Sequence, residues 1–438
     1  MFFLYSIILT VAFLVLLPRF IFDAIFKGKY AAGFTQRLGF LPPFEQDGRP
    51  VIWVHCVSVG ETNAARPLIQ QLADSLPPFR LIVSTTTRTG QELARQVFSE
   101  QAELVCYFPF DWKFSVRRAL RRFAPSAVIL LETEIWFNFL REANKSGAKT
   151  AIVNGRLSER SYKRFGYIKN FMRRVLSYPD LALMQTNLDA KRLMALGMRA
   201  TKVKVTGNMK FDQPDGGDEA LAREFRVRFG ITGDVPLIVA ASTHEPEEKW
   251  VLEAFNRVWK QSGTSLPRLL IAPRHPERFG SVADTIKNSG FGWARRSETA
   301  SARDLSAEVI LLDSIGELRS AISLADIVFV GGSLIPHGGQ SILEPAAAGK
   351  AIVTGPHTSN FKAVIDEFLK HDALIQLPEC PDKEIAERLA AAVAQLLDDH
   401  DLRRRIAANA ADVMTKNRGA TQKTVEYLKE MLGGQGGK

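Results

Sequence analysis

The feature of this sequence that most limits its fold is an alternation of short apolar runs with amphipathic helical segments. Apolar strands separated by helices are typical of a parallel sheet covered by helices on both faces. In the first half of the chain these runs are PVIWVHC, RLIVST, SAVILLE, KTAIVNG and LALMQT. A second series, after residue 212, consists of VPLIVAAS, PRLLIAP, AEVILLD, DIVFVGG and KAIVTG. The pattern predicts two doubly wound α/β domains with a cleft between them.

The length and the linker composition predict where these domains lie. A chain of 438 residues is longer than one average domain. The segment DQPDGGDEA at residues 212–220 is rich in Asp, Gly and Pro, which indicates a linker. We predict an apolar anchor over residues 1–26, a first domain over residues 27–211, and a second domain over residues 212–438 that ends in helices. The three cysteines lack CxxC spacing, which fits a reducing compartment and argues against structural zinc.

The N-terminal segment MFFLYSIILTVAFLVLLPRFIFDAIF has no charge before Arg19. It lacks the basic start and the small-residue cleavage site of a secretory signal. Its length is just enough to span a bilayer, and a helix in the membrane surface or a buried helix of a soluble protein are the alternatives. Because the basic residues follow it, we expect the body of the protein to be cytoplasmic.

Charge is unevenly distributed along the chain. Residues 1–206 carry a net charge of +14 and the remainder −4. The first half is therefore expected to meet an anionic partner, either nucleic acid or anionic lipid. The apolar N-terminus favours lipid, and no aromatic-basic signature of nucleic-acid binding accompanies the charge.

The second domain contains the densest candidate binding segment, VFVGGSLIPHGGQSILEPAAAGK. Its glycine pairs adjoin strand or helix ends, where backbone amides can approach a phosphate. A carboxylate in the following helix can accept hydrogen bonds from two ribose hydroxyls. Tight turns are the ordinary alternative for any one glycine pair. From this segment we predict nucleotide contacts by Gly332, Ser333, Gly339, Ser341 and Glu344.

Three further strand ends of the second domain carry polar residues. Arg274 is suited to a phosphate because its guanidinium can bind two oxygens at once. His244, His275 and His337 are too scattered in sequence to predict a metal site, and no GxxxxGK[ST] motif supports an ATPase. The further donor-site candidates are Ser242, Thr243, Arg274, His275, Gly316 and Glu317.

In the first domain, Glu61 follows a glycine where an apolar strand gives way to a helix. A glutamate in the first turn interacts favourably with the helix dipole, which is its ordinary structural explanation. Glu132 and Glu134 follow another strand, and alternation along a strand predicts that one faces the site while the other supports the scaffold. The further candidates at strand ends are Ser58 and Arg156.

The motifs HCVSVGE, ETEIW, NGRLSERS, GNMKFD, STHEPEE, PRHPERF, VGGSL, LEPAAAGK and GPHTSNF occur in order between about residues 30 and 365. This series resembles the Kdo transferases, membrane-bound glycosyltransferases that add 3-deoxy-D-manno-oct-2-ulosonic acid (Kdo) to a lipid A precursor such as lipid IVA. The resemblance implies the two-domain GT-B fold, CMP-Kdo in the second domain, the lipid acceptor in the first, and a place on the cytoplasmic face of the inner membrane.

The resemblance also implies roles for individual residues. Glu61 matches the catalytic base of an inverting transfer, with Ser58, Glu132, Glu134 and Arg156 supporting the acceptor or the transition state. A carboxylate at a helix N-terminus is expected to be ionised at neutral pH and hence a base of limited strength. Because the leaving group is a nucleoside monophosphate, we expect arginine and helix amides to neutralise it without a metal ion or other cofactor.

This chain departs from the family pattern at a few positions. Gln340, Ser341 and Ile342 replace the usual His-Asn-Pro, Phe137 replaces a proline, and Ala241 replaces a glycine. These differences bear on the donor contacts, so a transferase that uses another nucleotide sugar, such as a UDP-hexose, is the alternative. A lipid-binding protein with a relict site is a third possibility, against which the presence of Glu61, Arg274 and Glu344 argues.

Overall fold

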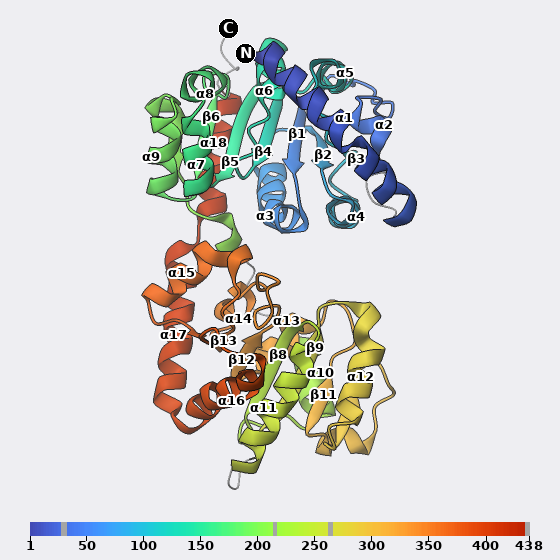
Figure 1. The fold of residues 1–438 in the computed structure, drawn as a ribbon, viewed down its shortest axis with the longest axis vertical. Coiled ribbons are helices and arrows are strands. Elements are labelled where there is room, and N and C mark those ends of the chain that lie inside the picture. The colour runs from blue at the N-terminus through green and yellow to red at the C-terminus, as the bar shows by residue number, and fades with distance from the viewer. Residues whose placement is uncertain (28–32, 213–216, 262–265, 434–438) are drawn as a thin grey trace. The chain divides into compact units, whose positions relative to one another are not determined.

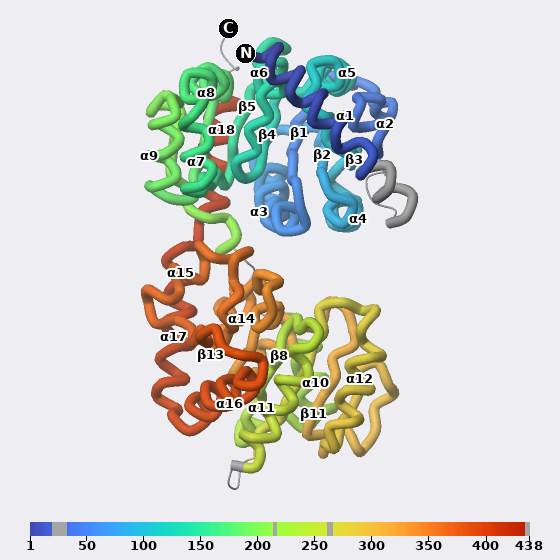
Figure 2. Tube along the Cα trace, viewed as in Figure 1, coloured from blue at the N-terminus to red at the C-terminus, as the bar shows by residue number. Residues whose placement is uncertain are grey.

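The computed structural model describes residues 1–27, 33–212, 217–261 and 266–433, and it separates into two compact units (Figures 1 and 2). Unit 1 comprises Met1–Asp212 with Arg418–Lys438, and unit 2 comprises Gln213–Asn417. Each unit has one seven-stranded parallel sheet. These two sheets with helices on both faces confirm the predicted α/β class.

The sheet of unit 1 has the strand order β3-β2-β1-β4-β5-β6-β7. Its strands are β1 (Val51–Cys56), β2 (Arg80–Thr85), β3 (Leu104–Tyr107), β4 (Ala127–Leu131), β5 (Lys149–Gly155), β6 (Leu181–Met184) and β7 (Val203–Val205). Its helices are α1 (Phe2–Lys27), α2 (Phe34–Arg37), α3 (Val59–Ser75), α4 (Arg88–Val97), α5 (Lys113–Phe123), α6 (Phe137–Lys145), α7 (Glu159–Gly166), α8 (Lys169–Val175), α9 (Asn187–Ala195) and α18 (Ala420–Gly433), with short 3-10 turns η1 (Ala200–Lys202) and η2 (Met209–Phe211).

Alternate residues of the buried strands pack against the helices on the two faces of the unit 1 sheet. Ile52 and Val54 of β1 pack with α3, α4 and α18, whereas Val51 and Trp53 pack with α5, α6 and α8. All six residues of β1 are buried, as expected for a strand covered on both faces. The carboxyl ends of these strands lead into the loops that carry the predicted site residues.

The sheet of unit 2 has the strand order β10-β11-β9-β8-β12-β13-β14. Its strands are β8 (Leu237–Thr243), β9 (Arg268–Pro273), β10 (Trp293–Arg295), β11 (Val309–Leu311), β12 (Ile327–Val330), β13 (Ala351–Thr354) and β14 (Ile375–Gln376). Its helices are α10 (Glu219–Arg228), α11 (Glu247–Gln261), α12 (Phe279–Lys287), α13 (Leu318–Leu324), α14 (Leu343–Ala347), α15 (Lys362–Lys370), α16 (Asp382–Asp398) and α17 (His400–Asn417), with 3-10 turns η3 (Pro276–Arg278), η4 (Ala302–Ser306) and η5 (Ser359–Phe361).

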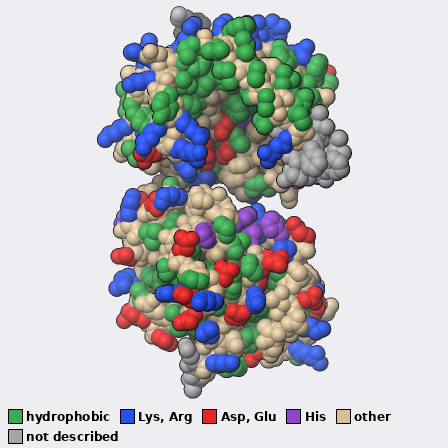
Figure 3. Space-filling view, in the orientation of Figure 1, with side chains coloured by type: hydrophobic (Ala, Val, Ile, Leu, Met, Phe, Trp, Pro, Cys, Tyr) green, Lys and Arg blue, Asp and Glu red, His purple; other side chains and the backbone are tan. Residues whose placement is uncertain are grey.

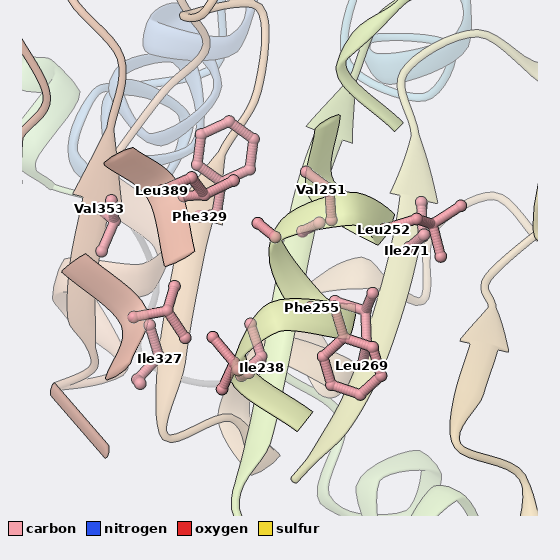
Figure 4. Close-up of a cluster of buried hydrophobic side chains, with 14 of the residues drawn as sticks. Ile238, Val251, Leu252, Phe255, Leu269, Ile271, Ile327, Phe329, Val353 and Leu389 are labelled. Atoms are coloured by element: carbon pink, nitrogen blue, oxygen red, sulfur yellow. The ribbon is translucent and has the colours of Figure 1, made fainter. Parts of the chain in front are cut away.

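A large apolar core lies on one face of this second sheet. Ile238, Ile271 and Phe329 from three strands pack against Phe255 of α11 and Leu389 of α16 (Figure 4). Burying an aliphatic or aromatic side chain of this kind contributes about 1.5–3 kcal/mol relative to leaving it exposed. This core fixes the carboxyl end of β8, from which donor-site candidates extend.

The C-terminal helix corrects the predicted domain boundary. The sequence placed all residues after 212 in the second domain, but α18 packs against α3 and β5 of unit 1. Its Val425 and Leu428 are buried in the core beneath α3. The carboxylate of Asp212 accepts hydrogen bonds from the Gly419 and Thr421 amides at 2.7 and 2.6 Å and so caps the start of the helix.

The apolar N-terminal segment forms α1, which lies along unit 1. Among the described residues, α1 is the one helix that is long and apolar enough to cross a membrane, over Phe2–Arg19. The Tyr5 hydroxyl donates to Asp111 at 2.9 Å, and the Trp112 indole donates to the Thr10 hydroxyl at 3.1 Å. The opposite face of α1 is apolar and exposed. Its members, all exposed, are Phe3, Leu4, Ile7, Ile8, Val11, Leu14 and Val15.

Candidate active site

Glu61 is held at the carboxyl end of β1, in the first turn of α3. Its side chain is only 6% exposed. One carboxylate oxygen accepts a hydrogen bond from the Val57 amide at 2.7 Å, and the other accepts one from the Ser58 hydroxyl at 3.1 Å. Ser58 is therefore placed to orient Glu61.

Two other carboxylates interact electrostatically with Glu61. Glu132 and Glu134 both raise its pKa, which indicates that both lie near it. The expected strand does not extend through these two residues, because β4 ends at Leu131 and Glu132 has a left-handed backbone with φ of 54°. Lys210 of η2 pairs with Glu132 at 2.9 Å and offsets part of this negative charge. Figure 3 shows acidic side chains gathered on unit 1 with Lys and Arg side chains nearby.

The environment of Glu61 makes it a stronger base than the sequence predicted. Burial raises the pKa of its carboxyl to about 7, and the charges of Glu132 and Glu134 add to this effect. The prediction of a fully ionised carboxylate was wrong because desolvation outweighs the hydrogen bonds and the helix terminus. Burial likewise raises the pKa of Glu134 to about 7. A carboxylate tuned to neutral pH is suited to general acid-base catalysis.

Arg156 lies at the next strand end. It follows β5, which pairs with β4 in the sheet. Its backbone is tied to the Glu132–Glu134 loop, because the Arg156 amide donates to the Thr133 hydroxyl at 2.8 Å and that hydroxyl donates to the Arg156 carbonyl. The Arg156 side chain is exposed. Unit 1 thus places Ser58, Glu132 and Glu134 near Glu61 and ties the backbone of Arg156 to the Glu132–Glu134 loop.

In unit 2 a buried glutamate, Glu247, organises the strand ends. It lies at the start of α11 and is fully buried. Its carboxylate accepts four backbone hydrogen bonds, from His244 at 2.9 Å, Gly332 at 2.6 Å, Ser333 at 3.0 Å and Leu334 at 2.9 Å. This carboxylate joins the loop after β8 to the glycine turn after β12.

The Glu247 contacts correct two predicted donor contacts. Gly332 and Ser333 were expected to present free amides to a phosphate, but Glu247 already engages both. The Ser333 side chain is also fully buried, and its hydroxyl accepts a hydrogen bond from Gly355 at 2.9 Å. At Gly331 a Cβ would lie 2.7 Å from the Ser242 carbonyl, so the glycine permits close packing of these two loops.

Other predicted donor residues also have internal partners. The Thr243 hydroxyl donates to Glu248 at 2.9 Å, and Glu248 pairs with Arg278 at 2.7 Å. Glu317 forms a bidentate pair with Arg296 at 2.9 and 3.0 Å, which lowers the pKa of its carboxyl. These side chains shape the strand ends through their own contacts.

The expected phosphate-binding helix is shorter than predicted. α14 is a single turn of five residues, which weakens any dipole effect at its start. The Ser341 hydroxyl accepts the Leu343 amide at 3.3 Å, and Gly339 bonds to the Gly332 carbonyl through its own amide at 2.7 Å. Glu344 is about one-third exposed and lies 3.2 Å from Arg319.

Three predicted residues keep polar groups accessible at the strand ends of unit 2. Ser242 is half-buried and has a left-handed backbone with φ of 56°. Gly316, in the loop before α13, has φ of 91°. Arg274 is exposed, and its amide donates to the Thr243 carbonyl at 3.0 Å. Among the described residues, none forms an ion pair with its guanidinium, which is therefore available to an anion.

Sequence reasoning missed Glu247, Lys210 and His337. Glu247 belongs to the quoted STHEPEE motif, but only the fold shows that its carboxylate reaches the turn after β12. Lys210 belongs to GNMKFD and pairs with a residue 78 positions earlier. His337 was considered only as a metal ligand, and its ring lies 4.3 Å from that of His244.

Two units, each with one parallel sheet of seven strands covered by helices, have the architecture of the GT-B class. UDP-GlcNAc 2-epimerase from Neisseria meningitidis has the same fold, with a TM-score of 0.57 at 13% identity over 87% of this chain and 100% of the epimerase. Residues 32–213 match the family model of 3-deoxy-D-manno-octulosonic-acid transferase, and residues 233–413 match glycosyl transferases group 1.

Relatives over nearly the full length identify the family. The chain is 34% identical to the 3-deoxy-D-manno-octulosonic acid transferase of Haemophilus influenzae over 92% of each chain. It is 30% identical to the enzyme of the same name from Chlamydia trachomatis, over 98% of this chain and 97% of the relative. This chain therefore belongs to the Kdo transferase family of glycosyltransferases.

Proposed function

We propose that this enzyme transfers Kdo from CMP-Kdo to the lipid A precursor lipid IVA and releases CMP, in lipopolysaccharide synthesis. The names of the relatives at 30–34% identity support the donor sugar. The observation that carries the proposal is the buried Glu61 carboxylate, whose pKa of about 7 suits a base at neutral pH.

In the proposed reaction Glu61 removes the proton from an acceptor sugar hydroxyl as that oxygen attacks the anomeric carbon of Kdo. The bond from this carbon to the CMP phosphate breaks in the same step, so one displacement inverts the configuration. The Val57 amide and the Ser58 hydroxyl fix the orientation of the carboxylate. This positioning contributes to the rate because the reacting groups need little further ordering.

On the donor side, the phosphate of the departing CMP gains negative charge as its bond to Kdo breaks. The exposed Arg274 guanidinium is suited to neutralise it with two hydrogen bonds. Glu344 is suited to accept hydrogen bonds from the ribose hydroxyls. We propose that these groups suffice without a metal ion.

For the acceptor we propose an anionic glycolipid at the cytoplasmic face of the inner membrane. The net charge of +14 over residues 1–206 supports attraction of its phosphates. The exposed apolar face of α1 supports contact with acyl chains. Because Tyr5 and Thr10 of α1 hydrogen-bond to unit 1, we propose that α1 lies in the membrane surface.

The test is incubation of the enzyme with CMP-Kdo and tetra-acylated lipid A precursor, with products resolved by mass. Wild-type enzyme should add Kdo at a rate that rises with pH through about 7, as Glu61 becomes deprotonated. Glu61→Gln should lower kcat by about 10²–10⁴-fold, because the amide cannot accept the proton. Its affinity for CMP should change little.

Glu92→Gln is the matched control, because Glu92 is an exposed glutamate of α4 paired with Arg88. This variant should retain wild-type kcat. Turnover of Glu61→Gln within a few fold of wild type would refute the base assignment. Transfer from a UDP-hexose with no transfer from CMP-Kdo would refute the proposed donor.

A further inference from the structure

Three histidines that are far apart in sequence gather on one face of unit 2. His244 follows β8, His275 follows β9 and His337 lies in the loop after β12, and these three strands are neighbours in the sheet. The ring centroids of His244 and His337 are 4.3 Å apart, and those of His244 and His275 are 5.2 Å apart. Figure 3 shows histidine side chains together on this face of unit 2.

The central ring, His244, has an unsatisfied polar atom. Only 7% of the surface of this residue is exposed. Its Nδ1 lies 3.2 Å from the Ser242 carbonyl and so carries a proton. Its Nε2 is buried without a hydrogen-bond partner. Leaving such an atom unpaired is unfavourable, which points to a ligand that completes the site.

The charged groups around the cluster favour an anion. Four backbone amides engage the Glu247 carboxylate, and Arg278 and Thr243 engage Glu248. Glu277 lies 3.7 Å from Nδ1 of His275 at the exposed edge. The exposed Arg274 guanidinium, which has no ion pair among the described residues, adds a permanent positive charge beside His275.

The free cluster resists protonation, and an anion is needed to change this. Burial lowers the pKa of His244 to about 4, and the neighbouring His337 and His275 lower it further. His244 is therefore neutral in the free protein. An anion against these rings reverses the effect, since an opposite charge within a few ångströms favours the protonated imidazole.

We propose that His244, His275 and His337, with Arg274, form a proton-linked site for the phosphate of the donor nucleotide. This inference rests on the proposed function for the identity of the nucleotide, CMP, and it adds His337 and His244 to the donor site. His337 is exposed, and its ring lies 4.3 Å from that of His244, so a ligand at His337 is close to the His244 ring. Binding of the phosphate is accompanied by uptake of a proton from solution.

A metal ion fits this cluster less well than an anion. Across the described residues, no group of three or more His, Cys, Asp or Glu side chains is placed to hold one. His275 is adjacent in sequence to a cation, Arg274, which disfavours a metal ion and favours an anion.

The test uses the methyl ester of CMP, a phosphodiester whose own charge does not change between pH 6 and 8. Calorimetric titration of the full-length protein in two buffers of different ionisation enthalpy measures both affinity and proton uptake. We expect the affinity to rise at least fivefold from pH 8 to pH 6, with a limit of tenfold per pH unit for one proton. Cytidine, which lacks the phosphate, should bind with no pH dependence.

His337→Asn removes one imidazole at an exposed position and should leave the fold intact, as a thermal melt will check. It should weaken binding of the ester at pH 6 several fold and reduce the pH dependence. His371→Asn is the matched control, because His371 is a partly exposed histidine that follows α15. This control should bind the ester with the affinity and pH dependence of the wild-type protein.

Three results would overturn or redirect the inference. Binding of the ester with equal affinity at both pH values and no proton uptake overturns the inference while leaving the proposed donor intact. Proton-linked binding of the methyl ester of UMP in place of the CMP ester supports the phosphate site but contradicts the proposed donor. Zn²⁺ binding at micromolar concentration that His337→Asn abolishes overturns the inference in favour of a metal site.

Discussion

At the scale of single residues, Glu61 has two hydrogen bonds at the end of β1, and Glu247 has four at the end of β8. Both lie in the first turn of a helix, so the sequence gives them the same local context. Glu247 is saturated by backbone amides and is therefore structural. Glu61 keeps acceptor capacity and has two carboxylates near it, and this difference makes it the candidate base.

The high pKa of Glu61 predicts a stability that depends on pH. A carboxyl whose pKa is higher in the folded than in the unfolded state stabilises the fold below the unfolded value of about 4.3. This contribution is lost as pH rises through the folded pKa of about 7. Glu61→Gln should thus raise the free energy of unfolding by about 1–3 kcal/mol at pH 8 and by little at pH 5.

Urea denaturation of both proteins at the two pH values checks this expectation. Glu92→Gln is again the control, since an exposed glutamate should give a small difference at either pH. A Glu61→Gln protein that is less stable than wild type at pH 8 would show that the ionised carboxylate is favourably placed, contrary to the assigned pKa.

At the scale of elements, α1 shows how neighbouring residues change what a sequence pattern forms. α1 has the composition of a membrane-spanning helix, yet its Tyr5, Ser6 and Thr10 face Asp111, Asn138 and Trp112 of unit 1. Asp111 also accepts the Asn138 and Phe139 amides at the start of α6. The polar stripe of α1 thus fastens it to unit 1 and leaves its apolar stripe exposed.

This arrangement predicts how the protein attaches to membranes. Replacing two exposed residues of α1, Ile8→Glu with Val11→Glu, should release most of the protein from anionic phospholipid vesicles, because charge opposes burial in the acyl layer. Co-sedimentation with vesicles measures the bound fraction. Val227→Glu, at an exposed position of α10 in unit 2, should leave binding unchanged. Full retention of the double variant would indicate that another surface anchors the protein.

At the scale of the whole molecule, the chain returns to its first unit after completing the second. α18 packs beneath α3, the helix that carries Glu61, and Leu428 is fully buried there. Asp212 caps α18 at the residue where the chain leaves unit 1. The last segment therefore supports the helix that carries Glu61, although it follows the second sheet in sequence.

The α18 packing predicts a destabilisation confined to unit 1. Leu428→Ala should lower the free energy of unfolding of that unit by about 2–5 kcal/mol, because it leaves a cavity in the core. Hydrogen exchange, read separately for the two units, measures this effect. Binding of CMP by unit 2 should be unchanged, and Val227→Ala is the exposed control. Equal loss of protection in both units would contradict the assignment of α18 to unit 1.

Local pattern was enough to predict several features of this protein. The strand runs around Ile52 and Ile238 and the helical periods between them predicted two covered parallel sheets, because burial on both faces requires continuous apolar strands. The motifs predicted that candidate residues such as Glu61, Glu132 and Arg156 would follow the strands, since parallel strands bring their carboxyl ends to one edge of the sheet.

Only the tertiary structure decided what these groups are able to do. The pKa of Glu61, the capture of the Gly332 and Ser333 amides by Glu247, the clustering of His244 with His337, and the return of α18 all depend on residues distant in sequence. Burial and electrostatic coupling act through space, so a local sequence pattern can place a carboxylate at a strand end but cannot set its desolvation or its neighbours.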